Sequence, residues 1–172
     1  GGCANRPGMA HTNIIGRRLD REVINLGFSG NALLDMEIAE LMASVDDPGL
    51  YVLDYVPNAS ADAIDQVGEH FFRIIRDAHP EVPVVFIEDV IFPHTIFDNK
   101  ILEEVTKKNV AQKRLFKKLK QSGEKRIYYI SAEGMIGDDG EATVDAIHFT
   151  DLGAMRYVDH VLPLIKRALR CH

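Results

Sequence analysis

The sequence has few cysteines, no long apolar run and no excess of basic residues. Its two cysteines, Cys3 and Cys171, lie at opposite ends of the 172 residues. Two cysteines do not make a disulfide framework and show no metal-ligand spacing, although they could pair if the termini meet. The cysteines therefore do not indicate whether the protein resides in an oxidising or a reducing compartment. The sequence predicts no metal and no cofactor. No apolar run approaches the roughly 18 residues that would predict a membrane span, and no signal peptide is visible.

The charge balance is acidic, with a formal net charge of −6. An acidic surface argues against a nucleic-acid partner, because nucleic-acid phosphates favour basic surfaces. One segment, residues 107–120, is rich in lysine, and we interpret it as a solvated helix face. Composition is otherwise that of a soluble globular protein, with 46% hydrophobic and 27% charged residues. The length fits one domain, which we expect to span residues 1–172.

The chain has no repeats and no low-complexity linker, and it alternates between short β-rich runs and longer helical patterns. Strands are predicted over Glu22–Leu26, Leu50–Tyr55, Pro83–Glu88 and Arg126–Ile130. Helices are predicted over Pro7–Leu19, Ala32–Ala43, Asp62–His79, Asn99–Gln121 and Thr150–Leu169. This alternation predicts an α/β fold with a parallel sheet and helices on both faces. Ligand sites in such sheets lie outside the carboxyl ends of the strands.

Two of these strand ends carry candidate groups for stabilising an oxyanion. The first predicted strand runs into Gly27-Phe28-Ser29-Gly30-Asn31, a tight turn whose backbone N–H groups could donate to an oxyanion. An ordinary strand-to-helix turn would explain the same glycines. Ser29 lacks the spacing of a nucleophile elbow, so we do not favour it as the nucleophile. Asn58 follows the second predicted strand and could aim its side-chain N–H at a developing charge, or simply occupy a turn after Pro57.

The strongest candidate pair lies near the C-terminus, in Asp145-Ala146-Ile147-His148. A carboxylate and an imidazole three residues apart can meet, which fixes the tautomer of the ring and leaves its other nitrogen facing outward as a general base. Thr150 or Asp151 is expected to cap the helix that follows. The alternative interpretation is a loop with a solvated histidine.

Taken in order, these segments resemble the SGNH/GDSL hydrolases over essentially the whole chain. That resemblance implies a flavodoxin-like three-layer α/β/α sandwich and a serine esterase or acylhydrolase, with carbohydrate acetyl esters as a leading substrate guess. It implies that Gly30 and Asn58 form the oxyanion hole, that His148 is the base and that Asp145 orients it. Asn58 arrives in Val-Pro-Asn rather than the family's commoner Gly-x-Asn-Asp.

The family's first block, a strand followed by Gly-x-Ser, is missing from this sequence. The opening Gly1-Gly2-Cys3-Ala4 looks like the stretch that follows the serine in some bacterial members, many of them exported. The resemblance therefore implies an N-terminally truncated domain of a periplasmic or extracellular protein, inactive as it stands. In flavodoxin-like order the missing strand would lie between the second and third strands of the family's sheet. Either it precedes Gly1, or another chain supplies it in a homo-oligomer or strand-swapped dimer, or the flanking strands close up directly.

Two other classes of protein remain as alternatives. A flavodoxin-like binding module would hold a small ligand in the same cleft without turning it over. A nucleic-acid-associated protein would use the lysine-rich segment, although this segment lacks interleaved aromatics. Other residues near the strand ends, among them Arg6, Glu88, Asp89 and His94, could line the cleft, but loop or capping roles explain them as well.

Overall fold

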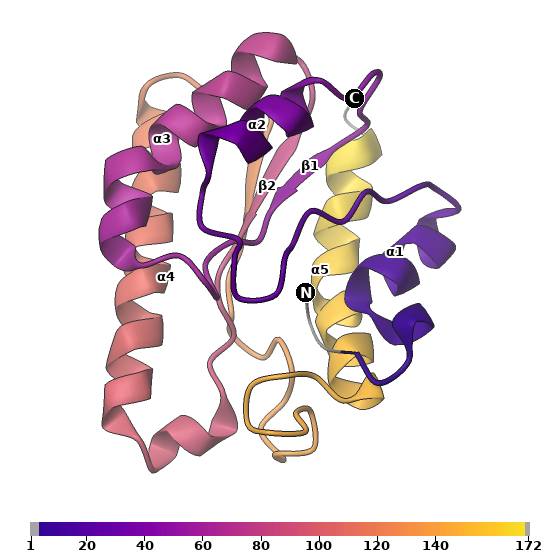
Figure 1. Ribbon diagram of the computed structural model, residues 1–172, viewed down its shortest axis with the longest axis vertical. Helices are drawn as coiled ribbons and strands as arrows, with labels where there is room; N and C mark the ends of the chain where they lie inside the picture. The colour runs from indigo at the N-terminus through magenta and orange to yellow at the C-terminus, as the bar shows by residue number, and fades with distance from the viewer. Residues whose placement is uncertain (1–3, 171–172) are drawn as a thin grey trace.

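Three short parallel strands form the sheet in the computed structural model, which describes residues 4–170. They are β1 (Tyr51–Leu53), β2 (Val84–Ile87) and β3 (Ile127–Ile130), in the order β1-β2-β3. Tyr51 pairs with Val84, which in turn pairs with Ile127. Each strand lies within a predicted range. The carboxyl ends of all three point toward the lower end of the molecule in Figure 1.

Helices cover both faces of this sheet (Figure 1). Along the chain they are η1 (Pro7–Met9), α1 (His11–Leu19), α2 (Met36–Ala43), α3 (Ala61–Ala78), η2 (Pro93–Ile96), α4 (Asn99–Gln121) and α5 (Asp151–Arg170). Helices α1 and α5 pack on one face, and α2, α3 and α4 on the other. The predicted α/β class with a parallel sheet is confirmed. Among residues 4–170, no helix is both long and apolar enough to cross a bilayer.

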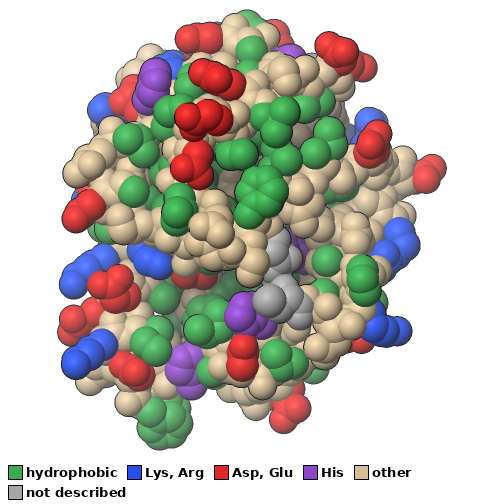
Figure 2. Space-filling model, viewed as in Figure 1, with side chains coloured by type: hydrophobic (Ala, Val, Ile, Leu, Met, Phe, Trp, Pro, Cys, Tyr) green, Lys and Arg blue, Asp and Glu red, His purple; other side chains and the backbone are tan. Residues whose placement is uncertain are grey.

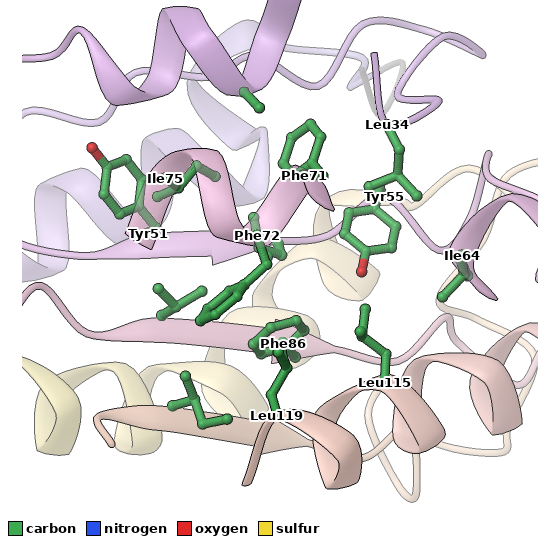
Figure 3. Close-up of a cluster of buried hydrophobic side chains, with 14 of the residues drawn as sticks. Leu34, Tyr51, Tyr55, Ile64, Phe71, Phe72, Ile75, Phe86, Leu115 and Leu119 are labelled. Carbon is green, nitrogen blue, oxygen red and sulfur yellow. The ribbon is translucent and has the colours of Figure 1, made fainter. Parts of the chain in front are cut away.

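Strand β2 divides its side chains between two hydrophobic cores. Val84 and Phe86 pack with α3 and α4, whereas Val85 and Ile87 pack with α5, because successive residues of a strand point to opposite faces. All four side chains are buried, as expected for a strand in a sheet covered on both sides. In the first core the rings of Phe72 and Phe86 lie 5.8 Å apart (Figure 3).

Side chains at the helix starts explain why the helices begin where they do. The Ser60 hydroxyl accepts a hydrogen bond from the Ala63 N–H at 3.1 Å and starts α3. The Asp98 carboxylate accepts from the N–H groups of Lys100 and Ile101 and starts α4. Both bonds satisfy backbone donors that have no partner within the first turn. These caps place α3 and α4 within one residue of their predicted bounds.

The strand predicted over Glu22–Leu26 is wrong. These residues have no regular secondary structure, and Val23 and Ile24 are 38% and 57% exposed. A β-rich run becomes a strand only when a neighbour accepts its hydrogen bonds, and within residues 4–170 β1 pairs on one edge only, with β2. The alternative in which this run closes up directly against β1 is therefore wrong as well. The helix predicted over Ala32–Ala43 starts later, at Met36.

Candidate active site

The loop that carries Asp145 and His148 lies at the carboxyl end of the sheet, between β3 and α5 (Figure 1). It folds back on itself like a short hairpin. The Val144 N–H donates to the His148 carbonyl at 2.8 Å, and the Thr150 N–H donates to the Ala142 carbonyl at 2.9 Å. The Thr150 hydroxyl accepts from the Gly153 N–H at 3.0 Å and so caps α5, as predicted. The base of this loop is thus fixed to the helix that follows it.

Within this loop the side chains of Asp145 and His148 are joined. The Nδ1–H of His148 donates to Oδ2 of Asp145 at 2.6 Å, while the other carboxylate oxygen accepts from the His148 backbone N–H at 2.7 Å. The hydrogen bond from the imidazole, followed by those from the backbone N–H groups of His148 and Ile147, lowers the pKa of Asp145 to about 2. The carboxylate is therefore ionised at neutral pH. It holds the imidazole with Nε2 available, which is the arrangement of a general base.

The turn between the two residues depends on an unusual backbone. Ala146 has φ of +74°, in the left-handed region that a side chain disfavours. We expect Ala146→Gly to raise the free energy of unfolding by about 0.5–1 kcal/mol, because glycine adopts this conformation without a steric penalty. Urea denaturation of the two chains measures the difference. Ala63→Gly, inside α3, is the control and should lower stability by about 1 kcal/mol. A loss of stability in both variants would contradict the proposed strain.

The two residues predicted to form the oxyanion hole lie in separate turns. Gly30 is exposed, with φ of +67°, in a turn closed by a hydrogen bond from the Asn31 N–H to the Phe28 carbonyl. Asn58 is half-buried in the turn that follows β1, where its N–H donates to the Tyr55 carbonyl at 3.0 Å. The Lys108 ammonium donates to the carbonyl of Pro57 at 3.2 Å and braces this turn against α4. The turn lies at the same end of the sheet as the loop of His148. The catalytic roles of Gly30, Asn58, Asp145 and His148 remain predictions.

The N-terminal segment packs against the start of α5, next to the loop of His148. Arg6 forms an ion pair with Asp151, with Nη2 at 2.5 Å from the carboxylate. A small pocket lies between this segment and the loop; its lining includes Ala4, Met9, His11, Phe149 and Thr150. Figure 2, which has the same view as Figure 1, shows a hollow in the lower half of the molecule with histidine and hydrophobic side chains around it. Ala4, the first residue that the structure describes, therefore lies beside the loop of His148.

Sequence patterns did not single out Asp54 or Tyr157, whereas Glu88 and Asp89 were named as residues that could line the cleft. Asp54, directly after β1, accepts a hydrogen bond from the Tyr157 hydroxyl at 2.6 Å. Tyr157 lies in α5 next to the apolar positions that predicted this helix. No spacing rule pairs Asp54 with Tyr157, because the two residues are far apart in sequence. Glu88 has a bracing role, since its carboxylate accepts from the Tyr129 hydroxyl at 2.6 Å and the Ala132 N–H at 2.8 Å. Asp89 is 5% exposed, and burial raises its pKa to about 7.

Cys3 and Cys171 lie outside residues 4–170, the part of the chain that the structure describes. Over that described range, no three His, Cys, Asp or Glu side chains group closely enough to hold a metal ion. The His94 ring lies 5.8 Å from that of Phe92, a packing contact within the loop after β2. The geometry of the described residues thus offers acid–base chemistry through one carboxylate–imidazole pair.

Comparison with known proteins agrees with this geometry. The model of the GDSL-like lipase/acylhydrolase family matches residues 1–166. A Bacteroides ovatus protein described as a GDSL-like lipase shares 34% identity, with a TM-score of 0.92 over 97% of this chain and 49% of that one. No curated protein sequence matches the chain significantly.

Two more distant structures share the fold. The salicylyl-acyltransferase SsfX3 from a tetracycline biosynthetic pathway is 16% identical, with a TM-score of 0.76 over 95% of this chain and 50% of that chain. A family two carbohydrate esterase from Cellvibrio japonicus is 14% identical, with a TM-score of 0.61 over 95% of this chain and 52% of that one. The chain thus spans about half the length of each of these three structures.

The parallel sheet with helices on both faces is the α/β fold that this chain shares with these three structures. The chain belongs to the GDSL-like lipase/acylhydrolase family. Membership supports hydrolysis of esters as the activity at the level of the family.

Proposed function

We propose that the chain is the later part of an SGNH-type serine esterase domain that hydrolyses carboxylic esters. The hydrogen-bonded pair of Asp145 and His148 at the carboxyl end of the sheet carries this proposal. The nucleophile is a serine N-terminal to Gly1. Its position is compatible with the packing of the N-terminal segment, because Ala4 lines a pocket with Phe149 and an extended residue spans at most about 3.6 Å. We propose that this serine lies within hydrogen-bond reach of Nε2 of His148.

The reaction follows from these positions. The serine oxygen attacks the ester carbonyl while Nε2 of His148 takes its proton, and Asp145 stabilises the imidazolium that forms. The Gly30 N–H and the Asn58 side-chain amide donate to the tetrahedral oxyanion. His148 then returns the proton to the leaving alkoxide. A water molecule then attacks the acyl-enzyme while Nε2 takes its proton. The bond between the acyl carbon and the serine oxygen breaks, the imidazolium returns the proton to that oxygen, and the carboxylic acid is released.

Acetyl esters of carbohydrates are the first substrates to test. The leading support is the resemblance to a family rich in esterases and deacetylases. The carbohydrate esterase of Cellvibrio japonicus shares the fold, although at 14% identity it carries no information on the substrate of this chain. Homo-oligomerisation, including exchange of a strand, and export from the cytoplasm remain further proposals.

An activity comparison tests the missing nucleophile directly. We expect a longer protein, with the residues upstream of Gly1 restored, to hydrolyse p-nitrophenyl acetate. The 172-residue chain should be at least about 1,000-fold slower, because a serine nucleophile cannot be replaced by the remaining groups. The matched control is the longer protein with its upstream serine changed to alanine, which should behave like the short chain.

Two outcomes would contradict the proposal. Equal turnover by the longer protein and the 172-residue chain would show that the nucleophile lies within residues 1–172. Binding of an ester by the longer protein, with no hydrolysis, would identify a non-catalytic ligand-binding domain instead.

A further inference from the structure

Tyr157 joins the end of β1 to the helix that follows the loop of His148. Its hydroxyl donates to Oδ2 of Asp54 at 2.6 Å, across 103 residues of sequence. The tyrosine is 4% exposed, so this bond lies away from bulk water. Asp54 directly follows β1 and precedes Asn58 by four residues. The hydrogen bond therefore connects α5 with the strand end that leads to the turn of Asn58.

The ring of Tyr157 also contacts the loop of His148 and the start of α1. Its centroid lies 5.5 Å from that of Phe149 and 4.9 Å from that of His11, while His11 and Phe149 lie 6.4 Å apart. Phe149 directly follows His148 and forms an antiparallel bridge with Thr143 across the loop. A shift of the Phe149 ring would therefore move the backbone that carries the imidazole. His11 belongs to the N-terminal segment that packs beside this loop.

The charges around the hydroxyl keep it in the donating form. Burial, and then the negative charges of Asp54 and Asp89, raise the pKa of Tyr157 well above its usual range. Burial lowers the pKa of His11, with the nearby Asp54 opposing this only in part. The phenol is therefore protonated at neutral pH and can serve as a permanent hydrogen-bond donor to Asp54.

Together these contacts bring three parts of the proposed site to one side chain: the end of β1, the loop of His148 and the N-terminal segment. We propose that Tyr157, held by Asp54, is a positioning residue that sets the imidazole of His148 relative to the turn of Asn58. This inference rests on the proposed esterase function. Tyr157 touches neither the substrate nor the reacting atoms in this proposal. It acts through Phe149 on one side and Asp54 on the other.

Tyr157→Phe removes the hydroxyl and keeps the ring. In the longer protein we expect kcat on p-nitrophenyl acetate to fall about tenfold with KM nearly unchanged, because a small misplacement of a catalytic group slows chemistry more than binding. The matched control is Tyr51→Phe. Tyr51 lies at the opposite end of β1, where its hydroxyl donates to the Met42 carbonyl at 2.8 Å. That variant also loses the hydrogen bond of a tyrosine hydroxyl, in this case to a neutral carbonyl, and should keep its kcat.

Asp54 supplies the second arm of the test. Asp54→Asn keeps an acceptor oxygen and should retain most of the activity, whereas Asp54→Ala should match Tyr157→Phe. The double variant Tyr157→Phe/Asp54→Ala should be no slower than either single variant, because both remove the same hydrogen bond. Additive losses would show that the two residues act independently and would overturn the proposal.

An NMR measurement on the 172-residue chain keeps the inference separate from the esterase assignment. The proton on Nδ1 of His148, bonded to Asp145, should shift in Tyr157→Phe and not in Tyr51→Phe. An unchanged signal in Tyr157→Phe, together with a wild-type kcat, would overturn the positioning role. Failure of the longer wild-type protein to hydrolyse any ester would instead refute the proposed function, whatever the NMR signal shows.

Discussion

His148→Gln should lower kcat on p-nitrophenyl acetate about 10,000-fold in the longer protein that contains the nucleophile. Glutamine keeps a hydrogen-bonding side chain of similar reach but cannot accept and return a proton near neutral pH. The serine would then have no base within reach. The loop should keep its shape, because backbone hydrogen bonds and the anchors at Phe149 and Thr150 hold it. We therefore expect the melting temperature to change little.

The matched control for this loss is His70→Gln. His70 lies on α3, which packs on the opposite face of the sheet from α5, in the core that contains Phe72 and Phe86. Its replacement should leave kcat and KM at the wild-type values. A wild-type kcat for His148→Gln would remove the base from the proposed reaction, and with it the assignment of Asp145.

Gly153→Ala should produce the largest loss of stability among glycine-to-alanine substitutions within residues 4–170. Gly153 lies in the first turn of α5, and a Cβ atom there would stand 1.9 Å from the Ala142 carbonyl oxygen. Helix propensity alone would favour alanine by about 1 kcal/mol. The clash is with backbone rather than with a flexible side chain, so the helix and the loop must separate. We expect the free energy of unfolding to fall by about 3 kcal/mol or more, as measured by urea denaturation.

Gly49→Ala provides the comparison. A Cβ atom on Gly49 would meet only Leu169 Cδ2, at 3.6 Å, which is an ordinary van der Waals contact. This variant should stay within about 0.5 kcal/mol of the wild type. Equal stability of the two alanine variants would mean that α5 and the loop are less tightly joined than the Ala142–Gly153 approach indicates.

Local signals predicted most of the helical layers. Helical patterns predicted α3 and α4 within one residue of their bounds, because such a pattern acts over one or two turns. The structure adds the caps at Ser60 and Asp98 that start these helices. The pairing of Asp145 with His148 was predictable for the same reason, since three residues separate them. The three strands followed from short runs rich in β-branched and aromatic residues.

The features that the sequence did not predict depend on contacts between residues far apart in the chain. Glu22–Leu26 has the composition of a strand, but its state depends on a neighbour that no local pattern reveals. The bond between Asp54 and Tyr157 joins residues 103 positions apart, and each looks ordinary in its own segment. The turn of Asn58 could be located at the end of β1, whereas the strand expected before Gly30 does not form. The distance of either turn from the imidazole depends on how the loops pack.

In the loop of His148, the groups that fix the backbone differ from the side chains that face solvent. Its backbone bonds and the inward side chains of Phe149 and Thr150 determine the path of the chain, while Val144 and Ile147 stand 53% and 54% exposed beside the imidazole. Val144 and Ile147 help to hold the turn through their backbone N–H groups and not through their side chains. Substitutions at these two positions therefore change the surface next to the imidazole while the acid–base pair and its scaffold stay intact.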